Sequence, residues 1–121
     1  MKLSPNFSLR EMTRSSTAIR NGIKNHPNED QLVALTALCQ KVLQPLRDHF
    51  GPISISSGLR VPQLNQLIGG SSNSDHCLGR AADCEVKSTE VSNYDFAKYI
   101  AEHMGFSKVI LEFYDKDEGP N

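Results

Sequence analysis

The chain has 121 residues, with 13 basic and 14 acidic side chains and a formal net charge of −1 at pH 7. At this length, and with 38% hydrophobic residues, we expect a single domain, residues 1–121, with a modest core of its own. The balanced charge excludes the strong positive field by which proteins bind nucleic acid or anionic membranes. We therefore expect a small or chemically specific partner.

The N-terminal stretch MKLSPNFSLREM lacks the apolar core of a signal peptide, and no run approaches the roughly 18 apolar residues of a membrane span. We therefore expect synthesis and folding in the cytoplasm. Cys39, Cys77 and Cys84 form no CxxC spacing, which argues against a disulfide framework and against a cysteine-rich zinc site. Free thiols are the simplest interpretation.

Two helices are predicted in the first part of the chain. Ser8 and Glu11 fit a capping box, which predicts a short helix near residues 8–13. A longer helix is predicted between Asn28 and Phe50, because apolar residues recur there at steps of three and four. Pro45 should bend this helix, since an interior proline removes a backbone hydrogen bond, and the glycine at position 51 should end it.

A half-buried strand is predicted at residues 53–56, where β-branched and polar residues alternate. This strand delivers Arg60 just beyond its end. Residues 62–68 should form a helical turn or two, with proline at the first position. The glycines and serines of residues 69–73 then break regular structure.

A second strand is predicted at residues 81–86. Its alternation places Ala82 and Cys84 toward the core and Asp83 on the opposite face. Ser92 is the expected cap of a helix that runs through about Met104 and is closed by Gly105.

The third and most hydrophobic strand is predicted at residues 108–114, and the polar tail DKDEGPN after it is typical of a hairpin connection. Together the elements predict an α+β fold in which helices pack on one face of a small antiparallel sheet.

The segment from Ser74 to Asp83 carries the clearest chemistry. Imidazole and carboxylate are standard zinc ligands, so His76 on a loop and Asp83 on a strand are candidate ligands that point into one cleft. Gly79 lets the loop turn into the strand. The alternative is a surface histidine in a glycine-rich turn, with Asp83 facing solvent. Two ligands also fall short of a hydrolytic zinc site, which uses three protein ligands and a water.

The same segment matches the pattern SxHxxGxAxD at every defined position, and it resembles the M15 peptidases, a family of zinc D-Ala-D-Ala carboxypeptidases and endolysins. Upstream, the residues SGLR at positions 57–60 resemble the family's SGYR segment, with Leu59 in place of the usual aromatic residue. The stretches FSLREMTRSSTAIRNGI and VILEFY are similar to the small phage-encoded branch of that family.

This resemblance implies that His76 and Asp83 bind zinc in a cleft at the sheet of a fold shared by Hedgehog domains and D-Ala-D-Ala peptidases. It implies that Arg60 binds a carboxylate or carbonyl of the peptide, that Ser57 supports its turn, and that Ser74 supports the loop presenting His76. Without the neighbouring motif, Arg60 would be read as a solvated surface arginine.

The implied activity is hydrolysis of a D-amino-acid-containing bond in the stem peptide of bacterial peptidoglycan. The implied origin is a phage or prophage whose product reaches the cell wall.

The sequence departs from the family at its third ligand, which members carry on a histidine in a WxH-like segment after the strand matching VILEFY. The chain has no tryptophan and runs to Asn121 without such a segment, and His26, His49 and His103 lie in unmatched positions. We favour truncation over a natural short form that has lost catalysis. A missing strand would leave a hydrophobic sheet edge, which invites dimerisation.

Glu112 is the candidate catalytic base on this chain, and its alternative is a strand glutamate that faces solvent or pairs with a lysine. A nucleophilic Cys77 is disfavoured, because no separate histidine and asparagine or aspartate arrangement supports it. The alternative function is a non-catalytic peptidoglycan-binding or virion structural module with a degenerate metal site. A Hedgehog-like binding domain is a third and less favoured interpretation.

Overall fold

The computed structural model describes residues 1–71, 74–88, 90–103, 110–115 and 119–120. The strands are β1 (Lys2–Ser4), β2 (Phe7–Ser8), β3 (Ile53–Ser57), β4 (Ala81–Val86), β5 (Ile110–Asp115) and β6 (Gly119–Pro120). The helices are α1 (Leu9–Thr13), α2 (Ser16–Arg20), α3 (Glu29–Leu38), the π-helix η1 (Cys39–Leu43), α4 (Gln44–Phe50), α5 (Pro62–Leu67), the 3-10 helix η2 (Asp75–Leu78) and α6 (Asn93–His103). The α+β class predicted from the sequence is confirmed.

The main sheet has the strand order β3-β4-β5-β6, and β1 and β2 form a separate antiparallel pair. The pairs β3–β4 and β5–β6 are antiparallel as expected, but β4 and β5 run parallel. The expectation of a wholly antiparallel sheet is therefore wrong at its centre. The physical reason is α6, because a helical crossover between two neighbouring strands returns the chain in the same direction, whereas a tight turn reverses it.

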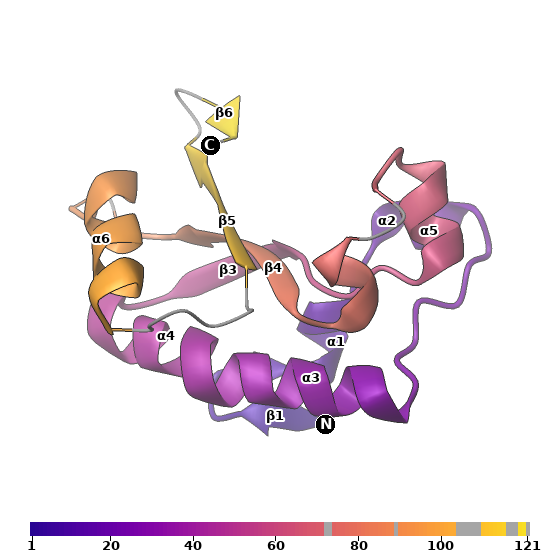
Figure 1. Ribbon diagram of the computed structural model, residues 1–121, viewed down its shortest axis with the longest axis horizontal. Helices are drawn as coiled ribbons and strands as arrows, with labels where there is room; N and C mark the ends of the chain where they lie inside the picture. Colours follow the sequence, from indigo (N-terminus) through magenta and orange to yellow (C-terminus); the bar gives the residue numbers. More distant parts are fainter. Residues whose placement is uncertain (72–73, 89, 104–109, 116–118, 121) are drawn as a thin grey trace.

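One long helical segment, made of α3, η1 and α4, lies along one face of the sheet (Figure 1). A π turn, η1, interrupts the α-helical pattern just before Pro45, and there the backbone N–H of Gln44 donates to the carbonyl of Cys39, five residues earlier. Pro45 follows directly and lacks an N–H, so the wider π turn accommodates the missing bond. The segment ends at Gly51, which has a φ of 88°. Glycine adopts a positive φ without the steric cost that other residues incur.

The hydrophobic core lies between this helical segment and the sheet. It contains Leu35, Leu38, Cys39, Val42, Leu43 and Leu46 from the helices, Ile53, Ile55, Ala82 and Cys84 from the strands, and Phe96 from α6. Cys84 and Ala82 thus face the core as their alternation predicted, and Asp83 takes the other face of β4.

The N-terminal elements hold the chain that follows β3. The capping box of Ser8 and Glu11 is confirmed at the start of α1, whereas β1, β2 and α2 were not predicted. The carbonyl of Met12 in α1 accepts the backbone N–H of Leu59 at 2.7 Å. A Cβ at Gly58 would run into that same carbonyl, so α1 and the chain after β3 approach this closely only because residue 58 is glycine.

At the other end of the chain, the hydroxyl of Ser92 accepts the N–H of Asp95 at 3.1 Å, which confirms the cap of α6. The expected end of this helix at Met104 and Gly105, and the expected strand start at Lys108, lie outside the described residues. The expected hairpin is confirmed by the pairing of β5 with β6.

Among the helices that the structure describes, none is long and apolar enough to cross a membrane.

Candidate metal centre

His76 is presented by η2, a single turn with a fixed start and a fixed end. Its backbone N–H donates to the hydroxyl of Ser74 at 3.2 Å, so Ser74 caps the turn. The turn ends at Gly79, whose φ is 74° and whose position leaves no room for a side chain, since a Cβ there would lie 2.8 Å from the carbonyl of Gln31. The loop predicted for His76 is therefore more ordered than the sequence suggested.

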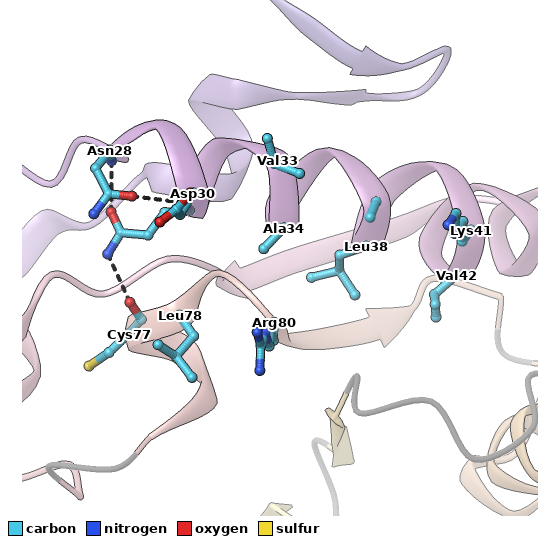
Figure 2. A pocket seen from close by; sticks show the side chains of 12 residues that line it. Asn28, Asp30, Val33, Ala34, Leu38, Lys41, Val42, Cys77, Leu78 and Arg80 are labelled. Atoms are coloured by element: carbon cyan, nitrogen blue, oxygen red, sulfur yellow. Dashed lines mark hydrogen bonds between the residues drawn. The ribbon is translucent and has the colours of Figure 1, made fainter.

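The start of α3 anchors the other side of this turn. The side-chain amide of Gln31 donates to the carbonyl of Cys77 at 2.8 Å, one of the dashed bonds in Figure 2. Figure 2 also shows a pocket of about 750 Å³ between the two segments, with Ala34 and Leu38 of α3 facing Leu78 and Arg80 across it. His76 does not line this pocket.

The imidazole of His76 is buried, with 2% of the residue exposed. Its Nδ1 lies 2.8 Å from the carbonyl oxygen of Gly58. Because a carbonyl oxygen only accepts, Nδ1 must carry a proton, and in the neutral ring the lone pair is then on Nε2. A hydrogen bond from one ring nitrogen to a backbone carbonyl is the usual way in which a metal-binding histidine is oriented.

The Nε2 atom of His76 lies 3.5 Å from Oδ1 of Asp83. The Asp83 side chain is 23% exposed and projects from β4, where its backbone pairs with Ser57 across a bulge in the β3–β4 ladder. The structure thus brings together the two residues that the sequence motif separates by seven positions. A lone pair and a carboxylate oxygen at this distance repel each other unless a cation or a proton stands between them.

The separation of His76 Nε2 and Asp83 Oδ1 fits two ligand atoms of one zinc ion. Zinc bonds of roughly 2.0–2.2 Å to nitrogen and oxygen place two ligand atoms of a tetrahedral site about 3.3–3.5 Å apart, which is the separation of Nε2 and Oδ1. In the part of the chain that the structure describes, no group of three or more His, Cys, Asp and Glu side chains is placed to hold a metal. The described residues therefore supply two ligands and not the third.

Arg60 lies beside this pair. Its backbone N–H donates to the carbonyl of His76 at 3.0 Å. Arg60 also shares a small cavity with Ser57, the other residue that the motif singled out on this segment. Arg60 and Ser57 therefore lie next to the predicted ligands, and Ser74 caps the turn that carries His76.

Asn25 is a positioning residue that the sequence did not indicate. It is 7% exposed, and its side-chain amide donates to the carbonyl of Leu59 at 2.8 Å and accepts the N–H of Val61 at 2.9 Å. These two bonds flank Arg60 on both sides. Its partners around Arg60 lie 34 and 36 residues away, and the amide also donates to the carbonyl of Thr13 in α1 at 2.9 Å. No local pattern could reveal the role.

A family model described as Peptidase M15 matches residues 5–117. The chain belongs to the peptidase M15 family. No curated protein and no solved structure matches it. M15 peptidases are in general zinc-dependent metallopeptidases, and the resemblance stated from the motif is thereby confirmed at the level of the family.

Glu112, the predicted catalytic base of this M15 chain, lies on β5 with its backbone in register with Asp83. Register places the two residues on neighbouring strands at the same level of the sheet. The catalytic role of Glu112 stays a prediction.

Of the histidines in unmatched positions, His49 stacks on Tyr99 of α6 with ring centroids 4.2 Å apart, and His26 is exposed on a loop.

The three thiols of the M15 chain are free, as predicted. Burial, with a smaller effect of Glu11 on Cys39 and of Asp83 on Cys84, raises the pKa of both thiols to about 12. Burial also raises the pKa of Cys77, against the opposing effect of the Arg60 charge. Raised pKa values keep thiols protonated at neutral pH, which argues against a thiolate nucleophile next to His76.

Proposed function

We propose that this M15 chain is a zinc-dependent peptidase that hydrolyses a D-amino-acid-containing peptide bond in the stem peptides of bacterial peptidoglycan. One observation carries the proposal: His76 donates through Nδ1 to the carbonyl of Gly58 and directs Nε2 to within 3.5 Å of the Asp83 carboxylate. This is the geometry of two zinc ligands, one of which is held by a backbone hydrogen bond.

In this proposal, Nε2 of His76 and Oδ1 of Asp83 hold the metal together with a ligand from outside the described residues. When bound, zinc polarises the scissile carbonyl and lowers the pKa of a water molecule. The hydrolysis itself breaks the C–N bond of the substrate, adds the water oxygen to the acyl carbon and returns a proton to the leaving amine. Glu112 is our candidate for the group that carries this proton.

Arg60 has the proposed task of binding the substrate. A guanidinium is planar and presents paired donors, so it suits a carboxylate or a carbonyl of the peptide. Its backbone is tied to the carbonyl of His76 and to Asn25 through the neighbouring peptide groups, so its start is fixed relative to the ligand pair. Because the backbone of Arg60 is already held in place, less conformational entropy is lost when its side chain binds substrate.

We also propose that the chain is a phage or prophage product that acts on the host cell wall. This step rests on the similarity of the segments FSLREMTRSSTAIRNGI and VILEFY to the small phage-encoded branch of the family.

The test uses the purified chain and soluble peptidoglycan fragments. We expect cleavage at a D-amino-acid bond, detected by mass spectrometry of the released products, loss of that cleavage on chelation and recovery on adding zinc back. Fragments that are bound but remain uncut at stoichiometric zinc would contradict the proposal and favour the non-catalytic binding module instead.

A further inference from the structure

The chain that leads from α5 to η2 is attached to a buried side chain, that of Asn65 in α5. Asn65 is 2% exposed. Its side-chain Nδ2 donates to the carbonyl of Ser71 at 2.6 Å, and its backbone carbonyl accepts the N–H of Gly70 at 2.8 Å. The segment in which glycines and serines break regular structure is therefore folded back onto the helix that precedes it.

The close approach of this segment to Asn65 depends on glycine at position 70. A Cβ at Gly70 would run into Oδ1 and Cγ of Asn65. The positive φ lies one residue earlier, at Gly69, where an added Cβ would meet no atom within 4 Å. Glycine is therefore needed at position 70 because of the contact with Asn65, and not because of a left-handed backbone.

Hydrogen bonds continue from Asn65 to His76. The Ser71 carbonyl that accepts from Asn65 also accepts the backbone N–H of Ser74 at 3.0 Å. The hydroxyl of Ser74 in turn accepts the N–H of His76 at 3.2 Å and caps η2. Asn65 is thus connected through two serines to the turn that carries the proposed zinc ligand.

The amide of Asn65 is a costly choice for a buried position. Its Oδ1 is buried and has no hydrogen-bond partner among the described residues. The opposite amide orientation would set Oδ1 against the Ser71 carbonyl, and two acceptors cannot form a hydrogen bond. Because a buried polar atom without a partner destabilises the folded state, stability alone favours an apolar side chain such as leucine here. Holding the Ser71 carbonyl, by contrast, requires the donor that Nδ2 provides.

We infer that Asn65 is a positioning residue for the metal centre: it holds the Ser71 carbonyl and, through Ser74, the turn that presents His76. The inference rests on the proposed function and deepens it, because it gives α5 a part in the site that the motif from Ser74 to Asp83 does not contain. A turn that is held in place before the metal binds loses less conformational entropy when His76 becomes a ligand.

The test is a double-mutant cycle on the full chain, with two measurements. Hydrogen exchange of the Ser74 and His76 amides is followed without metal, and zinc affinity is then measured by titration. Asn65→Ala should reduce the protection of both amides and lower zinc affinity about tenfold, the lower end of the effect of an outer partner. Gly70→Ala should act in the same direction, because its Cβ displaces the Asn65 amide. Added to Asn65→Ala, it should cause little further loss, since that amide is gone.

The matched control is Gln44→Ala, which removes another buried amide. Gln44 is 8% exposed, and its side chain bonds Ser4, Asn6 and Asp48. This variant should lower the melting temperature at least as much as Asn65→Ala, yet keep zinc affinity and the protection of the two amides. Gly70 is only half-buried, so Gly70→Ala tests the contact even where Asn65→Ala fails to fold.

Two results would overturn the inference. One is wild-type amide protection and zinc affinity in the Asn65 and Gly70 variants, and the other is an equal loss of both in Gln44→Ala. A wild-type chain that binds no zinc would instead contradict the proposed function. The exchange measurement needs no metal and still decides whether Asn65 holds the turn, so the two proposals fail separately.

Discussion

At the scale of the residue, His76 owes its orientation to one backbone carbonyl. The oxygen of Gly58 fixes the proton on Nδ1 and thereby turns Nε2 toward Asp83. The spacing made both residues candidate ligands, and the resemblance to the M15 motif favoured that interpretation over a surface histidine in a glycine-rich turn. Neither could supply the orienting carbonyl, which comes from a position 18 residues earlier in the chain.

Asn25 acts on Arg60 through the backbone, and its removal is the test of that role. Asn25→Ala leaves the N–H of Val61 and the carbonyls of Leu59 and Thr13 without their side-chain partner. We expect the free energy of unfolding to fall by about 1–3 kcal/mol, the usual cost of leaving buried polar groups unsatisfied. Chemical denaturation measures this loss.

The control for Asn25 is Asn21→Ala, because Asn21 is exposed and its side chain bonds only one local carbonyl, that of Thr17. This variant should lose no more than about 0.5 kcal/mol. A positioning role for Asn25 further predicts that Asn25→Ala weakens the binding of acetyl-D-Ala-D-Ala while zinc affinity is retained. Unchanged peptide binding in that variant would show that Asn25 serves stability alone.

At the scale of the element, η2 is the turn that carries the proposed ligand. The sequence predicted a loop here, because its glycines and serines break regular structure and a single 3-10 turn has no periodicity to detect. What closes the turn is tertiary contact with α3, through Gln31 and through the close approach of Gly79.

Gly79 and Gly69 form a matched pair that separates this contact from backbone strain. Both have a positive φ, 74° and 79°, but only at Gly79 would a Cβ meet another segment, the carbonyl of Gln31. Gly69→Ala should therefore cost about 1 kcal/mol of unfolding free energy, for the left-handed backbone alone. Gly79→Ala should cost clearly more and should also weaken zinc binding, since His76 lies on the displaced turn.

Thermal and chemical denaturation of the two glycine variants, followed by zinc titration, separate the steric contact with α3 from the cost of the left-handed backbone. If Gly79→Ala costs no more than Gly69→Ala and binds zinc as the wild type does, the contact with α3 does not position His76.

The other elements show where local pattern suffices. The spacing of apolar residues predicted the long helix, and alternation predicted β3 and β4 almost to the residue. Pro45 predicted an irregularity in that helix, and the π turn η1 lies just before it. Alternation carries no information on strand direction, so the parallel pairing of β4 and β5 was missed. The strands β1 and β2, three and two residues long, are too short for any period to appear.

At the scale of the whole molecule, the candidate site is assembled from parts that are distant in sequence. Asn25 comes from the N-terminal third, Arg60 from the chain after β3, and His76 and Asp83 from η2 and β4. A motif can name only the residues within its own span. The contribution of Asn25 depends on tertiary packing, because its side chain joins the end of α1 to the chain after β3.

The central claim is that His76 and Asp83 are zinc ligands, and zinc titration of the purified chain tests it most directly. We predict one zinc per wild-type chain and an affinity at least about 100-fold lower for His76→Ala, because loss of a ligand should exceed the roughly 10–100-fold effect of losing an outer partner. His26→Ala, which removes an exposed histidine, should bind zinc as the wild type does. Equal zinc affinity in His76→Ala and the wild type would contradict the assignment.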